Sequence, residues 1–253
     1  MKLSNQDCPL SDEEKAEMDK VPYASACGSL MYAMIATRPN IAFAVGVVSR
    51  YMSNPGKKHW EAMKGIIRYL KHTKSMCTCY GSQDLSVKGY INSDYARDLD
   101  KRRSTSGYDF TLAGGVVSWR SRLQDCITRS TTEAEYVAAN EACKEAIWLG
   151  RLVADLGIKV DMLELYCDSQ SAIQLAKNPV FHSKTKHIDV KYHFLRKAIK
   201  DKQIQLVKIH TKDNLADLLT KGLSRESFVH CRELLDGNHV NLSTLYVHRF
   251  TVT

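Results

Sequence analysis

The sequence predicts an α/β fold, with five short strands flanked by helices and a small helical segment in front of them. Apolar residues recur with a period of two in the short stretches and with a helical period in the longer ones. Glycine, proline and asparagine separate these stretches. Over residues 83–222 the order is β-β-β-α-β-α-α-β-α, which is typical of a sheet with helices packed on its faces.

The composition is that of a globular protein with a basic surface. The chain has 253 residues, of which 44% are hydrophobic and 25% charged, enough for a sizeable core in one or two domains. The formal net charge is +8 and the pI is about 9.0. Such a balance suits a polyanionic partner, with nucleic acid the first candidate. Many basic proteins bind no nucleic acid, so charge alone does not decide the function.

Eight cysteines are spread along the chain without a Cys-x-x-Cys pair. This pattern predicts reduced thiols in an intracellular compartment rather than a disulfide framework or a zinc site. The first residues lack the apolar segment of a signal peptide, and no run approaches 18 apolar residues. We therefore expect no signal peptide and no membrane span, and the choice between cytoplasm and nucleus stays open.

The N-terminal part of the chain is helical in pattern. Residues 1–22 are polar and charged, and residues 23–76 predict three helices. The helices are separated by Pro39 and by an Asn-Pro-Gly turn at 54–56. Lysine and arginine side chains cover the outer face of the third helix, residues 58–72. This face is either simply solvated or contacts a nucleic-acid backbone.

Three strands begin the next unit. They are predicted at residues 85–94, 105–112 and 116–119, with Gly114-Gly115 as the hairpin turn between the last two. A basic loop, Lys101-Arg102-Arg103, precedes the second strand.

A long helix is predicted over residues 132–156, and its first turn is acidic. Ser130 and Glu133 match a capping box, in which a serine and a glutamate satisfy the free N–H groups of the helix start. One glutamate suffices for that cap, so Glu135 is left to point elsewhere. Alternatively, both acids serve only the helix dipole.

The fourth strand, residues 163–167, ends at Asp168 and turns at once into a helix. The carboxyl ends of strands are where open α/β sheets place ligands and metals. Asp168 is therefore a candidate ligand, and the alternative is that it only caps the next helix.

The C-terminal part supplies another basic cluster and another acid. A helix is predicted at residues 188–200 after Lys184 and Lys186, and a fifth strand at 204–210. A helix at 213–221, capped by Asp213, carries Asp217 beside its apolar stripe. Residues 223–253 are expected to form a C-terminal helix and a tail without pattern.

Four acids thus lie on separate elements: Asp94, Glu135, Asp168 and Asp217. Mg²⁺ prefers oxygen ligands and is held by a few carboxylates together with substrate phosphate. A pair of such ions can stabilise the attacking and leaving oxygens in phosphodiester cleavage. The residues alone therefore favour a metal-dependent phosphodiesterase as one candidate function.

Several motifs in order add a family resemblance. The motifs are residues 89–90 (GY), 100–108 (DKRRSTSGY), 130–136 (STTEAEY), 167–173 (CDSQSAI), 185–192 (TKHIDVKY) and 214–221 (NLADLLTK). They resemble the ribonuclease H domain of copia-type long-terminal-repeat retrotransposon Pol polyproteins. Upstream, residues 22–25 (PYAS), 28–32 (GSLMY), 37–42 (TRPNIA) and 67–70 (IRYL) are similar to the end of the reverse transcriptase region of that family.

The resemblance implies a ribonuclease H-like mixed five-stranded sheet at 83–222, preceded by a helical remnant of the reverse transcriptase at 23–76. It implies hydrolysis of the RNA strand of RNA–DNA hybrids in reverse transcription, with two Mg²⁺ ions, or Mn²⁺ in their place. Glu135, Asp168 and Asp217 would be the catalytic metal ligands. Hybrid would contact the basic residues Lys101, Arg102, Arg103, Lys184 and Lys186. The chain would then be part of a larger Pol polyprotein.

The first carboxylate position of the family departs from its pattern. Asn92 stands where the resemblance places an aspartate. An amide is neutral and has one acceptor oxygen, whereas a carboxylate is charged and has two. Asp94 is the candidate substitute, but two residues along a strand is about 6–7 Å. We therefore expect an impaired nuclease, and the alternatives are a non-catalytic nucleic-acid-binding module and a retroelement relic.

Three more departures accompany Asn92. Arg97 stands where the family has glycine, and Asp109 lies within a predicted strand where an apolar residue is usual. Arg129 stands where leucine is usual before Ser130.

Overall fold

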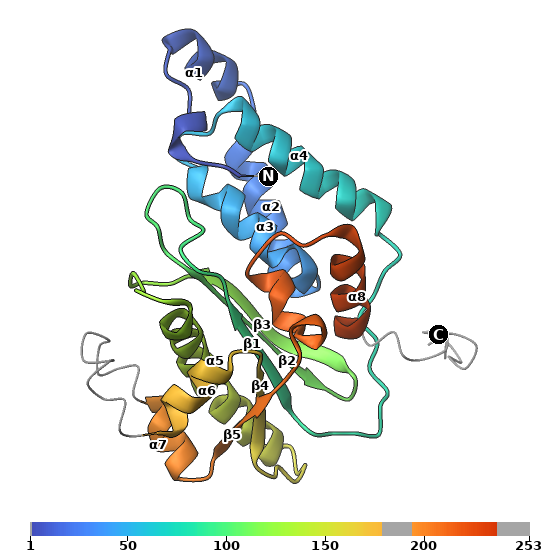
Figure 1. Ribbon diagram of the computed structural model, residues 1–253. Helices are drawn as coiled ribbons and strands as arrows, with labels where there is room; N and C mark the ends of the chain where they lie inside the picture. The colour runs from blue at the N-terminus through green and yellow to red at the C-terminus, as the bar shows by residue number, and fades with distance from the viewer. Residues whose placement is uncertain (1, 179–193, 237–253) are drawn as a thin grey trace, which may run out of the picture.

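The computed structural model describes residues 2–178 and 194–236, and a five-stranded sheet forms its centre (Figure 1). The strands are β1 (Lys88–Ser93), β2 (Thr105–Leu112), β3 (Gly115–Leu123), β4 (Leu163–Cys167) and β5 (Ile204–Lys208). They lie in the order β3-β2-β1-β4-β5. β1, β2 and β3 are antiparallel, whereas β4 is parallel to β1 and β5 is parallel to β4. The prediction of a mixed five-stranded sheet flanked by helices is confirmed.

The β2–β3 hairpin differs from the prediction by one residue. Its turn residues are Ala113 and Gly114, which both have positive φ, +54° and +86°. Two such residues form the kind of turn whose twist matches a β-hairpin. Gly115 already belongs to β3, which runs to Leu123, four residues beyond the predicted end.

One face of the sheet is covered by α5 (Thr131–Asp155), with α6 (Gln170–Lys177) and α7 (Phe194–Lys200) packed against that helix. Small residues along α5, among them Ala139, Ala142 and Ala146, let the helix lie close to the strands. The core between them includes Ile91, Phe110 and further large side chains, namely Tyr136, Leu165, Leu195 and Ile204. The N-terminal part of the predicted helix 188–200 lies outside the described residues.

The opposite face is covered near its centre by a short segment, where the predicted helix at 213–221 differs in type and bounds. The chain forms two short 3₁₀ helices, η6 (Thr211–Asp213) and η7 (Leu215–Leu219). Asn214, not Asp213, caps η7, because its Oδ1 accepts a hydrogen bond from Ala216 N at 3.3 Å. Its Nδ2 donates to Ile91 O at 2.9 Å and ties the segment to β1. α8 (Arg225–Leu235) then packs on η7.

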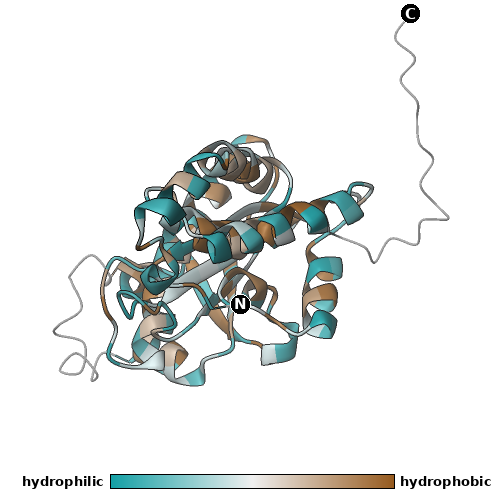
Figure 2. Ribbon diagram, turned by 90° about the horizontal axis from the view of Figure 1, so that it is seen from above, coloured by the Kyte–Doolittle hydropathy of each residue, from teal (hydrophilic) through white to brown (hydrophobic). Residues whose placement is uncertain are grey.

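The N-terminal part folds into a helical unit of α1 (Asp12–Asp19), α2 (Tyr23–Ala36), α3 (Ala42–Val48) and α4 (Lys57–His72). Figure 2 shows hydrophobic and hydrophilic residues in alternation along helical ribbons, and within this unit α4 has the clearest amphipathic pattern, with Met63 and Ile66 buried. α2, α3 and α4 were predicted, but α1 was not, because its sequence is almost entirely polar. Ser11 caps α1 by accepting a hydrogen bond from Glu14 N at 3.2 Å. No helix among the described residues has the length and apolar content to cross a membrane.

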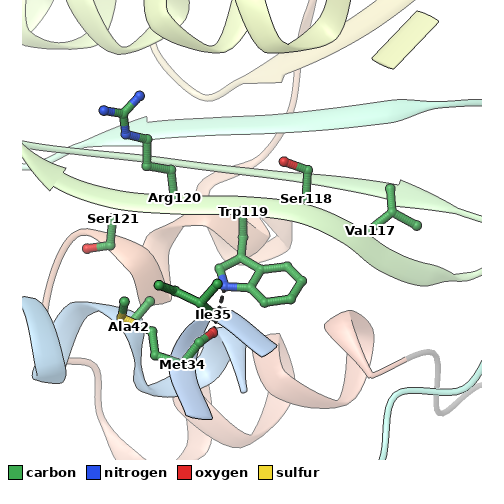
Figure 3. Close-up of a pocket in the computed structure, with 8 residues that line it drawn as sticks. All are labelled: Met34, Ile35, Ala42, Val117, Ser118, Trp119, Arg120 and Ser121. Carbon is green, nitrogen blue, oxygen red and sulfur yellow. Dashed lines mark hydrogen bonds between the residues drawn. The ribbon is translucent and has the colours of Figure 1, made fainter. Parts of the chain in front are cut away.

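Polar contacts join the helical unit to the sheet. Trp119 on β3 donates its Nε1–H to Met34 O at the end of α2, at 3.0 Å, beside a pocket of about 320 Å³ (Figure 3). Arg50 and Asp98 form an ion pair at 3.0 Å. The two parts of the chain therefore pack against each other along an edge of the sheet.

Candidate functional site

The parallel register of β1 and β4 brings two predicted site residues to one edge of the sheet. Ile91 pairs with Cys167, so Asn92 and Asp168, each one residue further on, lie beside each other where the two strands end. Glu135 reaches this edge from the start of α5, and Asp217 reaches it from η7. The sheet, α5 and η7 thus converge on one polar site.

Glu135 and Asp168 form one half of this site, together with a residue that the sequence analysis did not select. The ligand atoms of Glu135, Cys167 and Asp168 all lie within 4.8 Å of one another. Cys167 lies on the same strand face as the buried residues Leu163 and Leu165, so the sequence pattern indicates an ordinary buried strand residue. The only signal for another role was its place directly before Asp168.

Glu135 is nearly buried, with 7% of its surface exposed. Its Oε1 accepts a hydrogen bond from Ser93 N at 3.1 Å, while Oε2 has no hydrogen-bond partner among the described residues. Burial, reinforced by the charge of Asp168, raises the pKa of this carboxyl to about 8. A buried carboxylate oxygen without a partner is a position that a bound cation would satisfy.

The serine half of the predicted capping box is confirmed. Ser130 accepts a hydrogen bond from Glu133 N at 3.2 Å, and the carboxylate of Glu133 accepts one from Arg129 N at 2.8 Å. Glu133 therefore completes the helix start, and Glu135, half a turn later, points into the site.

Asp168 is not the cap of α6. Ser169 has that role, because its Oγ accepts a hydrogen bond from Ala172 N at 3.3 Å. The backbone oxygen of Asp168 accepts a hydrogen bond from Lys208 Nζ on β5, which holds the strand end in place. The alternative in which Asp168 only caps the helix is therefore wrong.

Asn92 and Asp217 form the other half of the site. The Nδ2–H group of Asn92 donates to Asp217 Oδ1 and, at 3.0 Å, to Thr220 Oγ1. Lys221 Nζ lies 2.8 Å from the same Asp217 oxygen. Burial raises the pKa of Asp217, and the ammonium group of Lys221 opposes that shift. Asp217 is close enough for its charge to contribute to the raised pKa of Glu135.

Asp94 does not join this cluster. Its Oδ1 accepts a hydrogen bond from Thr105 N at 2.5 Å, which fixes the loop between β1 and β2. The side chain is buried, and that burial raises its pKa to about 6. The geometry gives Asp94 a structural partner of its own and does not favour it as a substitute for the carboxylate expected at position 92.

A cleft of about 890 Å³ lies between the helical unit and the loop after β1. Cationic residues from separate segments line it, together with fewer acidic ones. The cations are Lys2, Arg50, Arg68, Arg97 and Arg102, and the acids are Glu61, Asp94 and Asp98, of which Asp98 pairs with Arg50. Of the predicted nucleic-acid contacts, only Arg102 lies in this cleft. Lys101 and Arg103 are not among its lining residues, and Lys184 and Lys186 lie outside the described residues.

The sequence analysis missed the other cleft residues because they are far apart in the chain. Arg50 follows α3, Arg68 lies on α4, and Arg97 lies in the loop after β1. Only the packing of the helical unit against the sheet brings them together.

The two halves of the site differ in how well they fit a divalent metal ion. The Glu135–Asp168 half offers carboxylate oxygens, one of them without a partner, and so fits a cation. In the other half, Asp217 already contacts the amide of Asn92 and the ammonium group of Lys221. An ion at Asp217 Oδ1 would compete with these two groups.

Comparison with known proteins places the chain in a family. No family model matches it. It is 54% identical over 241 residues to the retrovirus-related Pol polyprotein from transposon TNT 1-94 of Nicotiana tabacum, covering 95% of this chain and 18% of that protein. It is 39% identical over 212 residues to the corresponding polyprotein from transposon RE2 of Arabidopsis thaliana, covering 83% of this chain and 14% of that protein.

A solved structure of the foamy viral protease-reverse transcriptase in complex with RNA/DNA hybrid aligns with a TM-score of 0.48 and 15% identity. The alignment covers 85% of this chain and 29% of that one. The chain spans less than a fifth of the length of the two curated relatives named above. It belongs to the family of retrovirus-related Pol polyproteins of plant transposons.

Proposed function

We propose that this chain is the ribonuclease H region of a retrotransposon Pol polyprotein, that it binds RNA–DNA hybrid, and that Asn92 impairs its hydrolysis of the RNA strand. The observation that carries the proposal is the hydrogen bond from the Asn92 amide to Asp217, at the place where the site would need a carboxylate. The activity and the polyprotein context are those of much longer relatives, so both are part of the proposal.

In this proposal, Glu135 and Asp168 hold a divalent ion, Mg²⁺ or Mn²⁺. The ion would polarise a phosphate oxygen and lower the pKa of a bound water. Ser93 N fixes the orientation of Glu135 by its hydrogen bond to Oε1. Asp217 is positioned by Lys221 and would complete the ligand set only after parting from Asn92.

Asn92 weakens this ligand set for a chemical reason. Asp217 can only accept hydrogen bonds when ionised, so the amide of Asn92 turns its N–H group, not its oxygen, toward that carboxylate. The position therefore contributes a donor where a metal needs an acceptor. A second ion between Asn92 and Asp217 would lack one negative charge.

The cationic cleft supports the binding part of the proposal. Arg68, Arg97 and Arg102 line it, and their exposed side chains are suited to phosphate groups. Hybrid recognition would rest on shape and on 2′-hydroxyl contacts rather than on base sequence. The same cleft favours the second candidate, a hybrid-binding module without catalysis.

All eight cysteines are free thiols, which supports an intracellular location as part of the proposal.

The test is cleavage of a labelled RNA–DNA hybrid with Mg²⁺ or Mn²⁺ by the chain, its Asn92→Asp variant and an Asn92→Asp/Glu135→Gln control. We expect Asn92→Asp to cut at least about 100-fold faster than the parent, a gain of the size that a single group stabilising the transition state provides at an active site. The control should not cut.

Equal cleavage by the parent and Asn92→Asp would show that Asn92 is not the impairing residue. Hybrid binding without cleavage by either protein would select the binding module. Folded proteins that neither bind nor cut would select the relic.

A further inference from the structure

The Glu135–Asp168 half of the site has a third potential ligand of a different chemical kind. Cys167 is 1% exposed, and its Sγ lies within 4.8 Å of a carboxylate oxygen of each of the two acids. In tetrahedral zinc sites, Zn–S distances of about 2.3 Å and Zn–O distances of about 2.0–2.2 Å place ligand atoms roughly 3.3–3.8 Å apart. Side-chain movements of roughly 1 Å would bring the three atoms to that spacing.

With the sulfur of Cys167 included, the three ligand atoms do not match the preference of Mg²⁺. Mg²⁺ selects oxygen ligands in an octahedral arrangement, whereas a thiolate selects softer ions such as Zn²⁺ and Cd²⁺. Ser169 N already donates a hydrogen bond to Cys167 Sγ at 3.4 Å, and such a donor would also stabilise a bound thiolate.

A second observation points to a bound cation at this place. Glu135 Oε2 is buried and has no hydrogen-bond partner among the described residues, while Oε1 is held by Ser93 N. The Glu135 side chain is therefore held through Oε1 while Oε2 has no partner, and a carboxylate oxygen of Glu135 lies within 4.8 Å of Cys167 Sγ and of a carboxylate oxygen of Asp168.

We propose that Glu135, Cys167 and Asp168 form a site for a thiophilic divalent cation, Zn²⁺ or Cd²⁺, which competes with Mg²⁺ for the two carboxylates. On binding, the thiol of Cys167 releases its proton to solvent as the metal–sulfur bond forms. No oxidant or reductant is needed. The inference rests on the proposed function only in sharing Glu135 and Asp168, and metal binding can be measured without any cleavage.

The test is titration of Cd²⁺ alone into the full chain, followed by the ultraviolet charge-transfer absorption of the cadmium–sulfur bond. Cys77 and Cys79, whose sulfurs lie 3.8 Å apart, would bind Cd²⁺ themselves and are first replaced by serine. In this background we expect saturation at a single equivalent. Cys167→Ser should abolish the signal, and Glu135→Gln should weaken binding by about tenfold or more.

Cys143→Ser is the matched control, because Cys143 is also buried in the α5 core but belongs to no such cluster among the described residues. Cys167→Ala serves as a second variant should the serine hydroxyl unfold the core, and circular dichroism checks the fold of each protein. An unchanged signal in both Cys167 variants would overturn the proposal, as would the absence of a signal in the background protein.

The cleavage-competent Asn92→Asp variant separates this inference from the proposed function. If the inference holds, micromolar Zn²⁺ inhibits that variant in the presence of excess Mg²⁺, and Cys167→Ser relieves the inhibition. If no variant cuts hybrid, the proposed nuclease fails while the cadmium titration still decides the thiophilic site.

Discussion

The side-chain amide of Asn92 donates a hydrogen bond to Asp217 Oδ1, the same oxygen that Lys221 Nζ contacts at 2.8 Å. Asp217 is therefore satisfied without a metal ion. An aspartate at position 92 would instead bring two carboxylates together in a buried site, where like charges repel strongly. The asparagine thus stabilises the metal-free protein.

Asn92→Asp is therefore expected to destabilise the metal-free protein while making its stability depend on divalent ions. The variant loses a buried hydrogen bond and gains a repulsive charge, which costs about 1–3 kcal/mol. Mg²⁺ or Mn²⁺ should recover much of this loss, since a ligand that binds only the folded state stabilises it by mass action. Thermal unfolding in EDTA and in millimolar metal measures both effects.

Asn92→Ala is the control for this experiment, because it removes the hydrogen bond without adding a charge. Its melting temperature should fall in EDTA and should respond to metal no more than that of the parent. The prediction would be contradicted if metal raised the melting temperature of the parent as much as that of Asn92→Asp.

The cationic cleft should carry hybrid binding. Replacing Arg68 or Arg102 by alanine should weaken binding several-fold and reduce the slope of log affinity against log salt by about one for each lost phosphate contact. Lys159→Ala is the matched control, because Lys159 is exposed, pairs with Asp161 and lies outside the cleft. Fluorescence anisotropy of a labelled hybrid at several salt concentrations measures the slope. Equal effects of Arg102→Ala and Lys159→Ala would place the binding surface elsewhere.

The sequence was sufficient for features that depend on local pattern and insufficient for those that depend on packing. The five strands, α2, α4 and α5 follow from periodicity and stop residues. The helix predicted at 213–221 differs in type and bounds because Asn214 bonds to β1 and the segment packs flat on the sheet as short 3₁₀ helices. Glu135 could be separated from Glu133 by capping rules, since a cap is a local feature.

The rest of the candidate site required the folded arrangement. The bond between Asn92 and Asp217 joins residues 125 positions apart. The sequence pattern of Cys167 is that of an ordinary core residue, and only the folded structure places its sulfur beside Glu135 and Asp168. The arginines of the cleft lie on separate elements and carry no shared motif.

Trp119→Phe should loosen the contact between the helical unit and the sheet. The substitution keeps an aromatic ring but removes the N–H donor to Met34 O, which should destabilise the fold by about 1 kcal/mol. Trp148→Phe is the control, because Trp148 is 56% exposed on α5. Urea unfolding followed by circular dichroism gives both free energies. Equal losses in the two variants would show that the hydrogen bond contributes nothing measurable.

Asp109 is a further departure from the family pattern, and it is expected to reduce stability at neutral and alkaline pH. The residue is fully buried on β2, and neither carboxylate oxygen has a hydrogen-bond partner among the described residues. Tyr90 pairs beside it on β1, and Cys231 of α8 lies close enough to sense its charge. Burial raises the pKa of Asp109 well above its ordinary value of 3.8.

The direction of the pH effect follows from that shift. Below the ordinary pKa both the folded and the unfolded chain carry the protonated acid, and the acid then costs least. As the pH rises, the unfolded chain releases its proton first, so the folded state loses stability until the pH passes the raised pKa. Asp109→Leu should therefore gain little at pH 4 and more than about 1 kcal/mol at pH 8.

Asp109→Asn controls for size, because the amide has the shape of the acid but does not titrate. The difference in unfolding free energy between Asp109→Leu and Asp109→Asn should therefore not depend on pH, and the amide fills no more space than the parent side chain. Chemical unfolding at pH 4, 6 and 8 measures all three proteins, and the titration of Glu135 and Asp94 cancels because those residues are common to each. A leucine gain that is the same at pH 4 and pH 8 would mean that Asp109 is not titrating differently in the folded chain, and that its cost comes from packing alone.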